Sequence, residues 1–557
     1  MCPGYAIRPF VDSRTLMTML EHPTRLFRAR KILTLAGNEP EALVVVGERI
    51  VANGPAAELR QRFPSAEHVE LGEAVVVPGF NDAHMHPSQA AEDLLHVDVS
   101  ASNVRSNAEV VKALRRAAEK TAPGSWIRAS RYDDGKMAEG HVLTRWDLDD
   151  AVSEHPVLVT QVAGHWGIVN SRALERAGLN DDSVPPDGGA YGRDASGHLN
   201  GVLYERALFA FANPSIGAQP PVIPPTGLED HLGGLRRALR QFHAAGLTSI
   251  ADAAAGPDDV RLYQTAEQRG ELTARVNMLV SYAHFDRIRN LGLMSGFGSS
   301  RLRINGVKAF VDGAIGGRTC WLEQPFEGTD DYGMQTISTR DLSDLVRMVH
   351  MAGSRLGVHA NGDRAIALLL DQLEAAEAEL PRPDAHHRIE HCSVITEQIL
   401  QRMRRLGAIA VPFGSYVHYH GGNLVKWYGA QRLERMFTHR AFLDAGVAVA
   451  GSSDYPCGPF EPLLAMQSCV TRTGWDGTPI GVSQRISIRE ALELYTLGGA
   501  YASGEEATKG RLAPGYLADF VVLDQDPLVS EPSRLGQIQV LATYVGGVRV
   551  WPDGGAG

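Results

Sequence analysis

Residues 75–86 read VVVPGFNDAHMH, in which an apolar β-branched run leads through a turn into a His-x-His pair. Alternate residues of an extended chain point to the same side, so His84 and His86 can bind one metal ion together. In a (β/α)8 barrel the active site forms at the carboxyl ends of the strands. The stretch therefore predicts the first strand of such a barrel, with a metal site at its end.

Seven more short apolar runs follow, and helical stretches lie between them. The runs span 247–252, 275–280, 304–310, 355–359, 387–391, 408–412 and 447–451. Strands that alternate with helices indicate a parallel sheet, and eight such units favour a closed barrel over an open sheet. We therefore expect an α/β fold with a (β/α)8 TIM barrel across residues 75–507.

The two ends of the chain hold short β runs of another kind. Residues 26–74 and 508–557 each have too few strands for a separate core. Because the ends of a domain often lie close together, we expect them to pair into one composite β-sandwich domain. Residues 88–235 are too long for a connection between barrel strands and predict an inserted cap. Residues 1–25 are set apart as an N-terminal extension.

The composition narrows the class of protein. The 557 residues are 44% hydrophobic and 21% charged, as in an ordinary globular protein, and their net charge is −11. No dense basic run is present, so we do not expect nucleic acid as a partner. Five scattered cysteines without a CxxC pair indicate a reducing compartment. With no long apolar stretch to span or enter a membrane, a cytoplasmic protein is expected.

Residues suited to metal chemistry fall on or just after five of the predicted strands: His84, His86, Lys308, His359, His391 and Asp454. Each has a simpler explanation by itself, since single histidines are usually hydrogen-bonded and aspartate commonly caps a helix. Lys308 is the least ordinary, because an amine inside a barrel carries a large desolvation cost unless it has a partner. Their joint position at one barrel mouth predicts a metal site.

Several strings in these regions resemble those of a known family. Residues 77–86, VPGFNDAHMH, resemble the metal-binding signature of the amidohydrolase superfamily. The strings VKAFVDG (307–313), HANGDRA (359–365), RIEHC (388–392) and GSSDYP (451–456) look like its amidohydrolase-3 branch, which includes N-substituted formamide deformylases. The resemblance covers nearly the whole chain.

The resemblance implies a particular set of ligands. His84 and His86 would bind the more buried ion, and His359 and His391 would bind a second one. Lys308 would bridge both ions as a carbamate formed with CO2. One or two zinc ions are expected, with a binuclear centre favoured, because imidazole and carboxylate ligands suit zinc.

The resemblance also implies a reaction, the hydrolysis of a C–N amide bond in a small N-substituted amide or formamide. Asp454 would ligate the first ion and act as general base toward a metal-activated hydroxide, then as general acid toward the leaving nitrogen. His165 and Glu205 in the cap, and Arg318 after the fourth predicted barrel strand, follow the branch pattern and are candidate substrate contacts. Trp166 is a candidate for the pocket wall, and Tyr132 lies where this chain departs from the branch.

Two enzyme alternatives share this scaffold, a deaminase and a cyclic-amide hydrolase. Lys308 argues against a deaminase, because deaminases of this type tend to use one ion and no bridging lysine. A non-catalytic relative is a third alternative, but such relatives typically lose ligands and none of the six is missing. A homodimer or higher homo-oligomer is expected from the resemblance alone.

Overall fold

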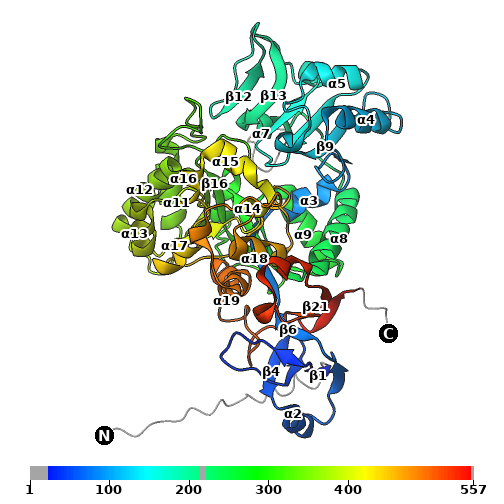
Figure 1. The fold of residues 1–557 in the computed structure, drawn as a ribbon, viewed down its shortest axis with the longest axis vertical. Helices are drawn as coiled ribbons and strands as arrows, with labels where there is room; N and C mark the ends of the chain where they lie inside the picture. The colour runs from blue at the N-terminus through cyan, green and yellow to red at the C-terminus, as the bar shows by residue number, and fades with distance from the viewer. Residues whose placement is uncertain (1–22, 213–220, 553–557) are drawn as a thin grey trace.

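The computed structural model describes residues 23–212 and 221–552. A barrel occupies the middle of the molecule, with a cap at one end and a small β domain at the other (Figure 1). Most of the predicted N-terminal extension lies outside the described residues, and its last residues already belong to a strand, β1 (Thr24–Arg28). Among the described helices, none combines the length and apolar character needed to cross a membrane.

The barrel is built on a parallel sheet of seven strands. In spatial order these are β19 (Ile409–Pro412), β18 (Arg388–His391), β17 (Leu356–Ala360), β16 (Leu302–Phe310), β15 (Arg275–Ser281), β14 (Leu247–Ala255) and β7 (Phe80–Met85). Every residue of β14 and β15 is buried, as expected for parallel strands covered on both faces. The fold class predicted from the sequence is therefore confirmed.

The eighth segment closes the barrel without forming a regular strand. Val449 and Ser452 make parallel bridges to the β19 side, with Ala410 and Phe413 as their partners. On the other side, the amide of Ala83 in β7 donates to the carbonyl of Gly451 at 3.0 Å. The predicted run at 447–451 thus occupies the position of the eighth barrel strand. It is joined to its neighbours by a few hydrogen bonds and not by a continuous β ladder.

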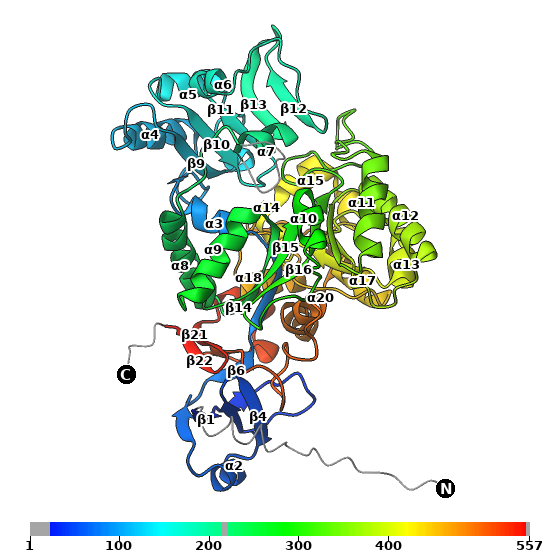
Figure 2. The ribbon, with the colours of Figure 1, turned by 180° about the vertical axis from the view of Figure 1, so that it is seen from behind.

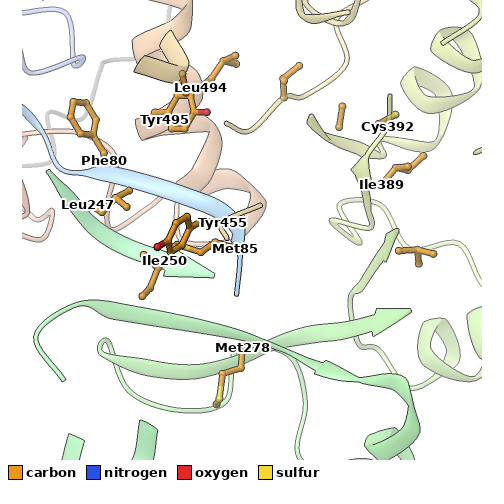
Figure 3. Packing of buried hydrophobic residues seen from close by; sticks show 14 of the residues in the cluster. Phe80, Met85, Leu247, Ile250, Met278, Ile389, Cys392, Tyr455, Leu494 and Tyr495 are labelled. Carbon is orange, nitrogen blue, oxygen red and sulfur yellow. The ribbon is translucent and has the colours of Figure 1, made fainter. Parts of the chain in front are cut away.

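Amphipathic helices cover the outside of the barrel (Figure 2). They include α8 (Leu228–Ala244), α9 (Pro257–Gln268), α11 (Thr339–Met351), α12 (Asp363–Glu379) and α13 (Glu397–Leu406). The Ser338 side chain caps the start of α11, and Gly407 ends α13 in the left-handed conformation that suits glycine. Their apolar faces and the outward faces of the strands form one core, part of which is shown in Figure 3.

Both chain ends build the small β domain. One sheet has the order β4 (Arg49–Gly54), β3 (Ala42–Val46), β1 and β5 (Glu67–Glu70). The other has the order β2 (Lys31–Ile32), β6 (Val75–Pro78), β20 (Phe520–Leu523), β21 (Val540–Val545) and β22 (Val548–Trp551). The expected pairing of the two ends is thus present, with β6 running antiparallel to β20.

This pairing corrects one prediction, because Val75–Pro78 lies in the small β domain and not in the barrel. The chain crosses from one sheet to the other at Gly79, whose amide still bonds to Asp519, while the amide of Phe80 already bonds to Gly246. A side chain at position 79 would collide with Thr248 at 2.2 Å. The run from Val75 to Phe80 therefore contributes to two different sheets. The sequence pattern alone does not show where one sheet ends and the other begins.

The insertion carries its own six-stranded sheet. Its order is β12 (Gly189–Arg193), β13 (Leu199–Glu205), β11 (Trp166–Val169), β10 (Val157–Gln161), β9 (Ile127–Tyr132) and β8 (Val97–Asp98). The predicted range of 88–235 is too wide at both ends, because α3 (Pro87–Asp93) and the first turns of α8 pack into the barrel core.

Candidate metal centre

Three of the predicted ligands converge at the carboxyl end of the barrel. His84 ends β7, His86 precedes α3, and Asp454 follows the eighth segment. The Oδ1 atom of Asp454 lies 3.2 Å from Nε2 of His86 and 3.4 Å from Nε2 of His84. One ligand atom from each residue falls within 4.8 Å of the others. This spacing is suited to holding one metal ion.

The ring of His84 is oriented by a buried carboxylate. Its Nδ1 lies 2.5 Å from Oε2 of Glu390, and Arg388 donates to both oxygens of that carboxylate. Nδ1 therefore carries the proton and donates it to Glu390, which leaves the lone pair of Nε2 toward the barrel mouth. Burial, followed by the nearby Lys308, holds the pKa of His84 well below its usual value.

Lys308 lies on β16 with no exposed surface. Its Nζ is 3.3 Å from Nε2 of His84 and 4.8 Å from the centre of the Phe310 ring. No ion pair of Lys308 is present within the described parts of the chain. Burial lowers the pKa of Lys308 to about 8, so this amine loses its proton more readily near neutral pH than an exposed lysine does.

His359 and His391, at the ends of β17 and β18, complete the group. Their ring centres are 4.5 Å apart, and that of His391 is 4.6 Å from that of His84. Burial keeps the pKa of both well below the usual value. Nδ1 of His391 is buried without a hydrogen-bond partner in the described structure. Neutral imidazoles, a carboxylate and an orphaned nitrogen at one mouth fit zinc.

The backbone at the centre is strained. His391 and Asp454 have φ values of 70° and 55°, in the left-handed region that residues with side chains rarely adopt. Such strain persists where the surroundings hold it, and it gathers at functional sites. Asp82 helps to keep this backbone in place, because its Oδ1 accepts hydrogen bonds from the backbone amides of His84 and Ser453, both at 3.1 Å.

A pocket opens from the centre toward the cap. Its lining includes His86, Lys308, His359, His391 and Asp454. The cap side of the pocket includes the apolar residues Leu208, Phe209 and Ile223 beside polar ones such as Thr160 and Arg128. The pocket therefore joins the candidate ligands to an apolar wall.

One predicted cap residue, His165, reaches this pocket. Its Nδ1 lies 2.7 Å from Oε2 of Glu205, a buried carboxylate that also accepts a hydrogen bond from Thr319. Burial alone would lower the pKa of His165, but the charge and hydrogen bond of Glu205 outweigh it and raise the pKa. Glu205 thus lies behind His165 and acts on the pocket through it.

Tyr132, Trp166 and Arg318 lie outside the lining of the pocket. The hydroxyl of Tyr132 donates to Asn107 at 2.8 Å, and its ring packs against Trp166 in the core of the cap. Arg318 pairs with Asp134 at 2.9 Å and lies over Trp427. None of these three side chains is part of the pocket lining, and their roles as substrate contacts stay predictions.

Glu390, Arg388 and Asp82 were missed by the sequence analysis. The first two lie inside the RIEHC string and Asp82 lies inside FNDAHMH, so the quoted motifs contained them. No spacing rule marks them, because they contact His84 or its neighbours and are not candidate ligands themselves. The available signal was a charged residue close to a candidate ligand on the same strand: Asp82 two positions before His84, and Glu390 and Arg388 one and three positions before His391.

Comparison with known proteins agrees with this geometry. The model of the amidohydrolase family, amidohydrolase-3 branch, matches residues 67–551, and a bacterial imidazolonepropionase-like composite domain matches residues 42–66. The chain is 31% identical to the N-substituted formamide deformylase of Arthrobacter pascens over 517 residues, covering 91% of this chain and 94% of that protein.

Two further relatives extend the comparison. Identity to the putative amidohydrolase YtcJ of Bacillus subtilis is 28%, over 92% of this chain and 96% of that protein. An uncharacterized metal-dependent hydrolase from Pyrococcus furiosus has a similar structure, with a TM-score of 0.70 and 26% identity over 91% of this chain and all of the other. The chain therefore belongs to the amidohydrolase family, whose members are hydrolases acting on carbon–nitrogen bonds.

Proposed function

We propose that this protein is a cytoplasmic zinc amidohydrolase that cleaves the C–N bond of a small N-substituted amide or formamide with an apolar or aromatic group. The observation that carries the proposal is the convergence of His84, His86 and Asp454 beneath the pocket. Similarity to an N-substituted formamide deformylase over most of both chains supports the substrate class.

The candidate ligands would be shared between two ions. His84, His86 and Asp454 would hold the first, and His359 with His391 would hold the second. Lys308 would bridge them after its neutral amine adds to CO2, forming a carbamate and releasing one proton. When bound, zinc would polarise the substrate carbonyl and lower the pKa of water.

Asp454 is the proposed proton carrier. Its carboxylate lines the pocket beside His86 and is mostly buried. It would take a proton from the attacking water and deliver it to the leaving nitrogen, so that amide and water become a carboxylic acid and an amine. His165 faces the same pocket and would donate a hydrogen bond to the substrate, with Glu205 holding its ring.

The charges around the pocket support an apolar substituent over an anionic one. The guanidinium of Arg128 is already paired with Glu92, at 2.6 Å. Carboxylates such as Asp93, Asp252 and Asp258 also line the pocket. Among the described lining residues outside the metal centre, no unpaired amine or guanidinium remains for a substrate carboxylate. The apolar cap wall would then receive the N-substituent.

The test is a panel of N-substituted formamides and acetamides with zinc-reconstituted protein. Matched pairs would carry either an aryl or alkyl substituent or the same substituent with a carboxylate. We expect kcat/KM to be at least tenfold higher for the uncharged member, about 1.4 kcal/mol in transition-state binding. Release of ammonia from an aminated ring or opening of a lactam would instead support a deaminase or cyclic-amide hydrolase, and inertness a non-catalytic relative.

A further inference from the structure

The interior of the barrel below His84 contains an ion pair that the proposed reaction does not use. Arg388 and Glu390 both belong to β18, two positions apart, and both side chains are buried. Arg388 donates from Nε at 2.7 Å and from Nη2 at 2.8 Å to the two carboxylate oxygens. Because the pair is neutral as a unit, the barrel can hold it without an isolated buried charge.

This pair contacts both His84 and the residue before it. Oε2 of Glu390 accepts the proton on Nδ1, and Nη2 of Arg388 donates to the carbonyl of Ala83 at 2.6 Å. The first contact sets the rotation and tautomer of the ring. The second holds the backbone of β7 immediately before His84. Ring and backbone are therefore positioned by one buried unit.

The sequence leaves room for this unit at Gly357. A Cβ at that position would lie 2.7 Å from Oε1 of Glu390 and 2.8 Å from Cδ1 of Leu279. Both distances are shorter than real Cβ atoms show, and Glu390 cannot swing away without breaking its bonds to Arg388 or His84. The φ of Gly357 lies outside the left-handed region, so side-chain space is what requires glycine here.

We propose that Glu390, oriented by Arg388, is a positioning residue that keeps Nε2 of His84 directed at the first metal ion, and that Gly357 creates the space it needs. This rests on the proposed function, in which His84 is a metal ligand. Carboxylates behind ligand histidines raise the basicity of the ring, and their loss typically weakens metal binding 10- to 100-fold.

Two independent variants test the proposal. R388M/E390M replaces the pair by apolar side chains, a change that buried ion pairs often tolerate in stability. G357A removes no polar group and adds a methyl group that crowds Glu390 and Leu279. We expect both to raise the Kd for Zn2+ by about 10- to 100-fold, measured by competition with a chromophoric chelator. The Tm of the metal-free protein checks that each variant folds.

Matched controls come from the same barrel. E505M/K509M removes another buried ion pair, whose atoms are 2.5 Å apart and do not contact His84. G306A adds a Cβ that meets the carbonyl of Arg355 first, at 3.0 Å. Both controls should keep the wild-type Kd for Zn2+. If the variants and the controls lose affinity for Zn2+ to the same extent, a specific role for Glu390 is overturned.

A spectroscopic readout separates positioning from a purely structural role. In the metal-free protein, 15N shifts of the His84 ring should report Nδ1 protonated in the wild type and a mixture of tautomers in R388M/E390M. Unchanged Kd and unchanged tautomer in folded R388M/E390M and G357A would overturn the inference while the proposed function stands. A wild type that takes up no stoichiometric metal would overturn both.

Discussion

Two fully buried lysines lie in this barrel, and their surroundings differ sharply. Lys509 lies near the beginnings of β14 and β15, where its Nζ is 2.5 Å from Glu505 and 3.2 Å from the hydroxyl of Ser249. Lys308, at the carboxyl end, faces an imidazole nitrogen and an aromatic ring instead. Burial lowers the pKa of both amines, but among the described residues only Lys509 forms an ion pair with a carboxylate, that of Glu505.

The same contrast holds for the two ends of the barrel as a whole. At the amino end, Arg275 makes two hydrogen bonds to Asp519, at 2.6 and 2.9 Å, and the charges there are satisfied by other charges. At the carboxyl end, neutral imidazoles and an amine crowd together and one ring nitrogen is left without a partner. Satisfied buried polar groups stabilise a fold, and a metal ion at the barrel mouth would give the unpartnered nitrogen of His391 a partner.

The largest expected effect contrasts one aspartate from each end. Asp454→Asn should lower kcat by about 10³-fold, because general acid–base catalysis contributes on that order, while the protein stays folded and keeps most of its metal. The check is steady-state kinetics on the best amide of the panel, together with metal analysis.

Asp519→Asn is the control at the amino end and should behave in the opposite way. It leaves Arg275 without its full partner, so we expect a loss of about 3 kcal/mol in the free energy of unfolding with kcat unchanged. Near-normal turnover in the Asp454→Asn variant would remove Asp454 from its role as base.

The second prediction contrasts the two lysines directly. Lys308→Ala should lose the bridged pair of ions, so that metal analysis finds at most one zinc per chain, and short carboxylates such as formate should partly restore the second. Lys509→Met should instead destabilise the protein and keep the wild-type metal count. An unchanged metal count in Lys308→Ala would contradict the bridging role.

The third prediction concerns the dependence of stability on metal. Because the carboxyl end relies on a ligand, stripping with a chelator should lower Tm, and zinc at about 1,000 times its Kd should restore about 4 kcal/mol. Calorimetry with and without chelator measures this difference. Asp519→Asn should show the same gain in stability from zinc, since the charged groups at the amino end pair with one another and do not bind metal. If zinc gives the wild type no gain in stability, a structural contribution of the metal is contradicted.

The smallest effect is a pH dependence that belongs to the amino end. His243 is bonded to the carbonyl of Leu247 and to Thr273, and burial lowers the pKa of His243 from 6.5 to about 4. The unfolded chain therefore binds the proton more readily. Stability should be constant above pH 6.5 and fall by about 1.4 kcal/mol per pH unit between 6.5 and 4 for this group.

Denaturation of metal-free protein at pH 7.5 and 5.5 measures this loss. His243→Gln should show a shallower loss than the wild type over the same interval, because its side chain does not titrate. Equal slopes in the two proteins would assign the acid sensitivity to other groups.

Much of the metal centre was predictable because barrel geometry converts strand ends into neighbours. His84, His86 and Asp454 are far apart in sequence, yet a closed parallel barrel places the ends of its strands around one mouth. The cap residues were less predictable, because no repeating geometry relates them. Tyr132 and Trp166 are held in the core of the cap, and His165 is the one cap residue predicted as a substrate contact that lines the described pocket.

The sequence by itself determined the barrel, the composite β domain and the residues at the mouth, because strand periodicity and polar strand ends are local properties of the chain. Only the tertiary structure decided that Val75–Pro78 pairs with β20, that the eighth segment closes through a few bridges, and that Glu390 orients His84. These outcomes depend on which segments meet in the folded chain and on the space left between them, as at Gly79 and Gly357. The local sequence pattern specifies neither the long-range pairing nor that space.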